Sequence, residues 1–228
     1  MERQHLIFDA DDTLWENNIY FEEAFERFYE YLSHSSLTAA QVRSVLDEIE
    51  IANAKVNGYG SKNFARNLAI CYQHLAERDI SPQDLAAVQA FAHAILEKPI
   101  ELLDGVAETV AQLCKRHELT LFTKGDPEEQ RLKIDRSGLR DYFAHTAIVK
   151  EKNEAAYREL VRHRGFTPER TWMIGNSPKS DINPALAAGL RAVYVPHPRT
   201  WSLEHEAVPE DHPRLVKINS IRELAKIF

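Results

Sequence analysis

Short strand-like runs alternate with helical segments along most of this 228-residue chain. Such alternation is typical of a parallel β-sheet that is covered by helices on both faces. We therefore expect an α/β fold in which the loops after the strands meet at one edge of the sheet. The expected strands are 4–8, 119–122, 144–149, 172–174, 192–195 and 215–218, and the expected helices between them are 106–117, 128–137, 154–163, 178–188 and 221–227.

One segment, residues 17–99, interrupts the alternation and is helical in pattern throughout. It follows the first strand directly, so we expect a small four-helix domain inserted into the α/β core at this point. Its insertion next to the end of a strand favours the role of a lid over the site edge. The expected domains are residues 16–99 for the helical insert and residues 1–15 with 100–228 for the core.

Helix start signals support this interpretation of the insert. Thr38 and Gln41 have the spacing of a capping box, in which each side chain bonds the backbone of the other residue. Ser81 and Pro82, followed by Asp84, predict the start of the fourth helix. The insert is therefore expected to fold as ordinary amphipathic helices around an apolar core.

The composition narrows the class of protein. Hydrophobic residues make up 44% and charged residues 28%, as in a globular protein, and no apolar run is long enough to span a membrane. The net charge of −7 without a basic stripe disfavours nucleic acid as the main partner. The first strand begins too early to leave room for a signal peptide, and Cys71 and Cys114 lie in apolar segments as reduced core thiols would. We therefore expect a cytoplasmic protein.

Residues 6–14 form the most informative local pattern, because three apolar residues lead into the carboxylates of Asp9, Asp11 and Asp12. Adjacent like charges repel each other, so the cluster is favoured only if something compensates it, and a metal ion would do so. The end of a strand is also where open α/β sheets bind ligands. A solvated turn that uses Asp as a turn former explains the same residues equally well.

Three further segments end at the same expected edge of the sheet. Thr123 closes a strand with a hydroxyl that could bond a phosphoryl oxygen, and Lys150 or Lys152 could neutralise a phosphate. Asn176 and Asp181 follow another strand and offer oxygen ligands for a hard cation. Each segment alone is also compatible with an ordinary turn or a solvated helix start.

In this order, the four segments resemble the motifs of the haloacid dehalogenase (HAD) superfamily, and within it a C1-capped, phosphoglycolate-phosphatase-like group. The segment Asp9-Ala-Asp-Asp-Thr13 is similar to the first motif, Thr123 to the second, Lys152 to the third, and residues 175–181 to the fourth. The resemblance spans residues 5–195. It implies a Rossmann-like parallel sheet core flanked by helices, with an inserted four-helix (C1-type) cap domain.

The resemblance also implies a chemistry: a Mg²⁺-dependent phosphatase that hydrolyses a small-molecule phosphate monoester through an aspartyl-phosphate intermediate. Asp9 would be the nucleophile, and Asp11 the general acid and base, with a pKa raised by its acidic surroundings. Thr123 and Lys152 would hold the phosphoryl oxygens. The implied Mg²⁺ ligands are Asp9, the backbone carbonyl of Asp11, Asp181 and Asn176.

Departures from the family pattern leave alternatives open. Asp12 stands where many members have glycine, and Asn176 replaces a common aspartate. Asn153 follows Lys152 where proline is frequent, so Lys150 is a second candidate for the active-site lysine. A 2-haloacid dehalogenase, a phosphomutase and a non-catalytic binding module are alternative functions, although a dehalogenase has no leaving alkoxide for an acid to protonate. The substrate and the oligomeric state are not specified by these motifs.

Two features outside the motifs also have competing interpretations. Trp15 lies just beyond the first motif and could contact substrate or pack in the core. His197, His205 and His212 fall in a proline-rich stretch, residues 196–213, and their spacing favours a solvated loop over a metal site.

Overall fold

The computed structural model describes residues 2–228, which form two compact units. The core unit comprises the chain up to Asn18 and Ile100–Phe228, and the helical unit comprises Ile19–Pro99. The first boundary lies at residue 18 and not at residue 15 as the sequence predicts. The physical reason is that the Asp12 carboxylate, in the core unit, accepts hydrogen bonds from the backbone amides of Asn17 and Asn18.

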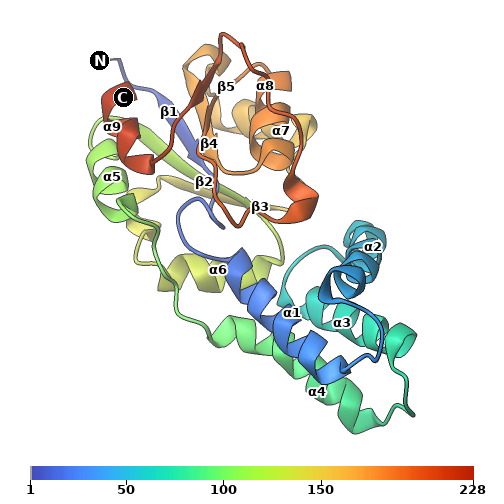
Figure 1. Ribbon diagram of the computed structural model, residues 1–228. Helices are drawn as coiled ribbons and strands as arrows, with labels where there is room; N and C mark the ends of the chain where they lie inside the picture. Colours follow the sequence, from blue (N-terminus) through green and yellow to red (C-terminus); the bar gives the residue numbers. More distant parts are fainter. Residues whose placement is uncertain (1) are drawn as a thin grey trace. The chain divides into compact units, whose positions relative to one another are not determined.

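The core unit contains a parallel sheet with the strand order β3-β2-β1-β4-β5-β6 (Figure 1). The predicted α/β class is confirmed, and each predicted strand is present. Because the strand order reverses on either side of β1, the carboxyl end of β1 is a topological switch point, where such sheets bind ligands. The strands are β1 (His5–Phe8), β2 (Glu118–Lys124), β3 (His145–Val149), β4 (Thr171–Gly175), β5 (Arg191–Tyr194) and β6 (Leu215–Lys217).

Helices cover both faces of this sheet. Leu6 and Phe8 of β1 belong to an apolar cluster with α5, α6 and α9, whereas Ile7 points to the opposite face and packs with α7 and α8. Figure 1 shows α5 and α9 on one side of the strands and α7 and α8 on the other. Burial on both faces explains why the central strands are continuously apolar. The helices are α5 (Val106–Leu113), α6 (Pro127–Arg136), α7 (Glu154–Arg164), α8 (Asn183–Ala187) and α9 (Leu224–Ile227).

The predicted helix at 178–188 is wrong in its first part, because the chain there forms a π-helical turn, Pro178–Ile182, before α8 begins. Pro184 has no N–H with which to continue an α-helical bond to the Ser180 carbonyl. That carbonyl accepts a hydrogen bond from the Tyr157 hydroxyl at 2.9 Å. Isolated π turns are frequent at functional sites, and this one carries Asp181.

The helical unit packs four α-helices around one apolar cluster that includes Phe28, Leu68 and Tyr72. The predicted capping box at Thr38 is present, and the predicted helix start at Ser81 also forms one. The fourth helix is followed by a 3₁₀ turn, Ala94–Glu97. Within the described residues, none of the helices combines the length and the apolar character needed to cross a membrane. The helices are α1 (Asn18–Leu32), α2 (Ala39–Asn57), α3 (Ser61–Leu75) and α4 (Pro82–His93).

Candidate active site

The four predicted motif segments meet at the carboxyl edge of the sheet. Asp9 follows β1, Thr123 lies near the end of β2, Lys152 follows β3, and Asp181 lies in the π turn after β4. Neighbouring parallel strands bring their carboxyl ends together, so residues far apart in sequence converge here. The convergence follows from the β-sheet order alone.

Lys152 connects two of the acidic residues. Its ammonium donates hydrogen bonds to Asp9 Oδ1 and to Asp181 Oδ1, the latter at 2.7 Å, and its side chain is only 1% exposed. Burial would lower the pKa of Lys152, but the charges of Asp181 and Asp9 outweigh burial and raise it. Lys150, the alternative candidate, is exposed to solvent. Of the two candidate lysines, Lys152 is the one that bonds Asp9 and Asp181.

Asp181 is held from a second side by the loop after β4. The Ser177 amide donates to Asp181 Oδ2 at 2.9 Å, and the carboxylate lies so close to Gly175 that an added Cβ there would be 2.3 Å from Oδ2. Only glycine allows this approach. Burial and the charge of Asp9 raise the pKa of Asp181, although Lys152 opposes them. Gly175 in the fourth motif is therefore needed because a side chain there would collide with the Asp181 carboxylate.

Thr13 and Asn176 orient Asp9. The Thr13 hydroxyl contacts Asp9 Oδ2 at 2.9 Å and Asn176 Oδ1 at 3.1 Å, and it accepts a hydrogen bond from the Asn176 amide at 3.1 Å. The side-chain amide of Asn176 donates to the Thr200 hydroxyl at 2.8 Å. These contacts fix the Asn176 side chain with its oxygen towards the first motif.

Asp11 has more donors around it than the sequence predicts. Lys133 Nζ contacts both carboxylate oxygens at 2.6 Å, Gln130 Nε2 donates at 2.8 Å, and the indole of Trp15 donates at 2.8 Å. Burial would raise the pKa of Asp11, but the Lys133 charge and the three donors lower it. The expectation of a raised pKa is wrong because Lys133, on α6, supplies a cation that the motif does not show.

Thr123 is buried, and its hydroxyl contacts the Lys124 carbonyl at 3.5 Å. A hydrogen bond of this length is weak, so a stronger acceptor at the sheet edge can replace it. The geometry is compatible with the predicted contact to a phosphoryl oxygen.

Asp12, which has no role in the predicted chemistry, has a structural one. Its backbone has a φ of 58°, in the left-handed region, where Asp and Asn are tolerated better than most residues. Its carboxylate accepts hydrogen bonds from the amides of Asn17, at 2.9 Å, and Asn18, at 3.0 Å. Burial and the charge of Asp11 raise its pKa to about 7. Asp12 therefore caps the start of α1, in a backbone conformation that would also suit glycine.

The proline-rich stretch, residues 196–213, is mostly exposed, His205 included, as the sequence predicts, but three of its side chains are largely buried. Thr200 and Glu204 are buried, and the side chain of His197 is only 9% exposed. The loop packs on the segments after β1 and β4 through hydrogen bonds from Asn18 and Lys179 to its backbone carbonyls. Composition suggested exposure, but polar contacts to the motif loops bury these side chains.

A family model described as "haloacid dehalogenase-like hydrolase" matches residues 4–189. This match covers most of the chain and includes all four motif segments. The chain belongs to the haloacid dehalogenase-like hydrolases. The solved structure of a HAD-like family hydrolase from Xanthomonas campestris is similar to it, with a TM-score of 0.86 and 32% identity over 99% of this chain and 90% of that one.

Two further similar proteins match most of the chain at lower identity. A glyceraldehyde 3-phosphate phosphatase of Pyrococcus furiosus is 25% identical over 88% of this chain and 84% of the relative. The HAD hydrolase YfnB of Bacillus subtilis, whose orthorhombic crystal form is bound to magnesium, has a TM-score of 0.71 and 20% identity over 100% of this chain and 99% of that one. The second similarity concerns the fold alone.

The donor groups of this HAD-like site suit a hard divalent cation. The carboxylates of Asp9 and Asp181 bond the same ammonium and therefore lie close together, and both are buried. With the oxygen of Asn176 nearby, the set consists of oxygen ligands, which Mg²⁺ prefers. Two anionic groups that share one cation gain from a second positive charge.

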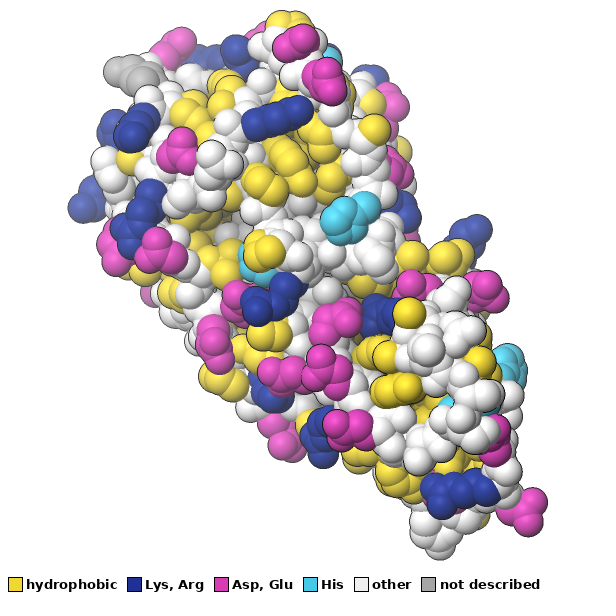
Figure 2. All heavy atoms as spheres, in the orientation of Figure 1, with side chains coloured by type: hydrophobic (Ala, Val, Ile, Leu, Met, Phe, Trp, Pro, Cys, Tyr) yellow, Lys and Arg dark blue, Asp and Glu magenta, His cyan; other side chains and the backbone are white. Residues whose placement is uncertain are grey.

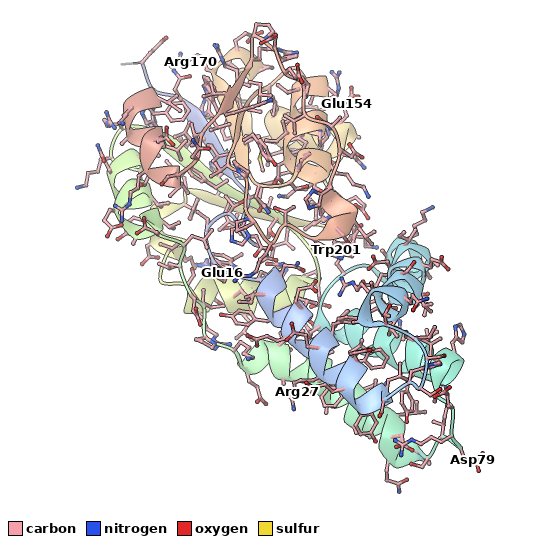
Figure 3. The ribbon with its side chains drawn as sticks, viewed as in Figure 1. Glu16, Arg27, Asp79, Glu154, Arg170 and Trp201 are labelled. Carbon is pink, nitrogen blue, oxygen red and sulfur yellow. The ribbon has the colours of Figure 1, made fainter. Side chains whose placement is uncertain are left out.

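A second group of candidate ligands lies beside the site. Asp12, Glu16 and His197 each offer an atom within 4.8 Å of the others, and Glu16 is labelled in Figure 3. Asp12 is bonded to backbone amides, and Glu16 pairs with Arg199 at 3.7 Å and with His197 at 3.5 Å. The partners of Asp12 are neutral amides, and Glu16 Oε2 has no hydrogen-bond partner, so these three residues are candidate ligands of a second cation site.

Several residues of the site were missed from the sequence. Most of them lie outside the four motifs, on α6 and in the loop after β5, where their spacing carries no signal, whereas Lys124 lies on β2 directly after Thr123. Lys133, a basic residue on the helix after the second motif, is the one of these residues that the sequence could have suggested as a partner of the acidic cluster. The missed residues are Gln130, Lys133, Thr200 and Glu204, together with Lys124.

Proposed function

We propose that this protein is a Mg²⁺-dependent phosphatase that hydrolyses a small-molecule phosphate monoester through a phosphorylated Asp9. The observation that carries the proposal is the buried ammonium of Lys152 bonded to both Asp9 and Asp181 at the sheet's switch point. A cation in this place can hold a phosphoryl group next to a carboxylate that would otherwise repel it. The phosphatase activity named for the Pyrococcus furiosus relative supports the same reaction class.

In the first step, an Asp9 oxygen attacks phosphorus, forming an Asp9–phosphorus bond as the ester oxygen–phosphorus bond breaks. The electron pair of the broken bond goes to the leaving oxygen, which takes a proton from Asp11. Thr13 holds the Asp9 carboxylate in place, so the attacking oxygen is oriented before substrate arrives. Lys152 and Thr123 bind the phosphoryl oxygens.

In the second step, water attacks the phosphorus of phospho-Asp9 and gives a proton to the Asp11 carboxylate. The Asp9 oxygen–phosphorus bond breaks, its electron pair returns to the Asp9 carboxylate, and phosphate is released. The ionised form of Asp11, favoured by Lys133, is the form that this step needs. The first step needs the protonated form, which the Lys133 contact opposes. The surroundings of Asp11 thus favour its role as a base over its role as an acid.

Mg²⁺ is part of this proposal, with Asp9, Asp181, the Asp11 backbone carbonyl and Asn176 as its ligands. When bound, it neutralises negative charge shared by the phosphate and the attacking carboxylate. Asn176 is a neutral ligand where relatives often have aspartate, so the site carries one negative charge fewer. We expect weaker Mg²⁺ binding as a consequence.

Small metabolites are the proposed substrates, with neither nucleic acid nor membrane as a partner, and the proposed location is the cytoplasm. Acidic and basic side chains are interspersed on the face drawn in Figure 2, without a basic stripe that nucleic acid would need. Cys71 and Cys114 are free thiols, as a reducing compartment favours.

Phosphate release from an aryl phosphate and from a panel of metabolite phosphates tests the proposal. We expect turnover with Mg²⁺, none with a chelator, and a loss of at least about 10⁴-fold in Asp9→Asn. Halide release from 2-haloacids without any phosphate release would contradict the phosphatase proposal and identify a 2-haloacid dehalogenase. Transfer of phosphate from Asp9 to a second substrate instead of water would identify a phosphomutase.

A further inference from the structure

Glu204 is a buried carboxylate outside the four motifs, in the loop marked by Trp201 in Figure 3. It is 7% exposed and lies in a short 3₁₀ turn, Ser202–Glu204. Its Oε1 accepts a hydrogen bond from Lys124 Nζ at 2.5 Å, and its Oε2 accepts one from the Ser177 hydroxyl at 2.5 Å. A carboxylate is buried at such a place only when both oxygens have strong donors, and Glu204 has them.

Each partner of Glu204 lies next to a residue of the proposed reaction. Lys124 follows Thr123, and its carbonyl accepts a hydrogen bond from Gln130, which also bonds Asp11. Ser177 follows Asn176, and its amide bonds the Asp181 carboxylate. The Glu204 carboxylate therefore connects the end of β2, which faces the phosphate, with the turn that holds the Mg²⁺ ligands.

We propose that Glu204 is a positioning residue that fixes the end of β2 relative to the turn at Ser177–Asp181. The inference rests on the proposed phosphatase function. Lys124 also donates to the Ser180 hydroxyl at 2.9 Å, so the lysine and the glutamate together link β2 to both ends of that turn. Thr200, in the same loop, holds Asn176. The loop after β5 is thus part of the active-site framework.

Charge is the decisive property of Glu204. Burial would raise its pKa, but the Lys124 charge and the hydroxyl donors lower it, so the group is ionised at neutral pH. Without this carboxylate, Lys124 loses the ion pair that joins the end of β2 to the loop after β5. The neighbouring Thr123 is then held less firmly against the phosphoryl oxygens, which lowers the rate of the chemical step.

The test compares Glu204→Gln with Glu206→Gln, a matched change at an exposed residue of the same loop. The kcat and KM for p-nitrophenyl phosphate, the half-saturating Mg²⁺ and the thermal midpoint are measured for both. We expect Glu204→Gln to lower kcat by about 10–100-fold with a KM change below about threefold, and to reduce the rise in midpoint that Mg²⁺ causes. Glu206→Gln should behave as wild type.

The double variant Lys124→Met/Glu204→Gln covers the case in which Glu204→Gln does not fold, because it removes both charges together. A lower kcat in a folded double variant also supports the positioning role. Wild-type kcat and Mg²⁺ response in Glu204→Gln, with only a lower midpoint, would show a purely structural role and overturn the inference alone. An inactive wild-type protein overturns the proposed function and the inference with it.

Discussion

The two units of this protein bury charge in different ways. In the core unit, Lys152 bonds Asp9 and Asp181 directly, and both acids have further donors. In the helical unit, Glu50 is 7% exposed, its nearest cation Arg43 is 3.8 Å away, and its Oε2 has no hydrogen-bond partner.

The fold surrounds the buried charges at the sheet edge with hydrogen-bond donors but leaves Glu50 without such a network. A complete network needs donors from several strands, and the sheet edge provides them. Glu50 sits on one helix and relies on a distant cation, so burial, only partly opposed by Arg43, raises its pKa to about 7. Burial raises the pKa of a carboxyl in both units, but only in the core unit are the carboxylates bonded directly to a buried cation. The weakly paired Glu50 makes the stability of the helical unit depend on pH.

Removal of Lys152 should have the largest effect on stability. Lys152→Met leaves two buried carboxylates without their shared cation, which should lower the free energy of unfolding of the metal-free protein by about 3–5 kcal/mol. Added Mg²⁺ should restore part of the loss, because it binds only the folded state. Urea unfolding followed by tryptophan fluorescence reports on the core unit, since Trp15, Trp172 and Trp201 all lie there.

Lys150→Met is the control, because Lys150 is exposed and close in sequence. It should change stability by less than about 0.5 kcal/mol. Equal stabilities for the two variants would mean that the Lys152 network contributes nothing, and the contrast with Glu50 would disappear.

Glu50→Gln should have a smaller effect, and one that depends on pH. The pKa of Glu50 rises from 4.5 to about 7 on folding, so its contribution is most favourable below the unfolded pKa and is lost as pH rises through the folded pKa. This rise in the pKa of Glu50 corresponds to a loss of roughly 3 kcal/mol at most in the free energy of unfolding at high pH. The variant should therefore be more stable than wild type by about 2 kcal/mol near pH 8, and close to it near pH 4.

Thermal unfolding followed by circular dichroism at several pH values measures this difference. Arg43 keeps Asp47 at 2.9 Å and Glu22 at 3.4 Å in the variant, so the cation is still paired. Glu48→Gln, an exposed change on the same helix, is the control and should show no such pH dependence. A pH-independent difference between wild type and Glu50→Gln would contradict the assigned pKa.

The fold was predictable because its signals are periodic and local. Alternating patterns predicted each strand, the capping box at Thr38 predicted one helix start, and Ser81 with Pro82 predicted another. The π turn before α8 was not predicted: Pro184 is visible in the sequence, but the Tyr157 hydroxyl that bonds the Ser180 carbonyl comes from another helix. Local sequence patterns determine where helices and strands form, whereas contacts between residues far apart in the sequence change where those helices and strands end.

The candidate site likewise contains residues that the sequence predicts and residues that it does not. Asp9, Thr123 and Asp181 stand at strand ends that the sequence marks, so their convergence followed from β-sheet order. Lys133 and Glu204 reach the site from a helix and a loop with no motif around them. The error in the pKa of Asp11 arose there, because acidic neighbours are visible in sequence whereas a cation supplied by another element is not.

Asp12 gives the smallest expected effect and sharpens the comparison with Glu50. Both acids have a pKa of about 7, but the Asp12 carboxylate is bonded to the amides of Asn17 and Asn18. Asp12→Asn keeps an acceptor and tolerates the left-handed φ of 58°, so it should cost less than about 0.5 kcal/mol. Asp12→Ala loses the cap and keeps the unfavourable φ, and should cost about 1–2 kcal/mol. Urea unfolding by tryptophan fluorescence separates the two variants. If both variants lose the same stability, the charge of Asp12 matters more than its hydrogen bonds, and the distinction drawn between Asp12 and Glu50 is wrong.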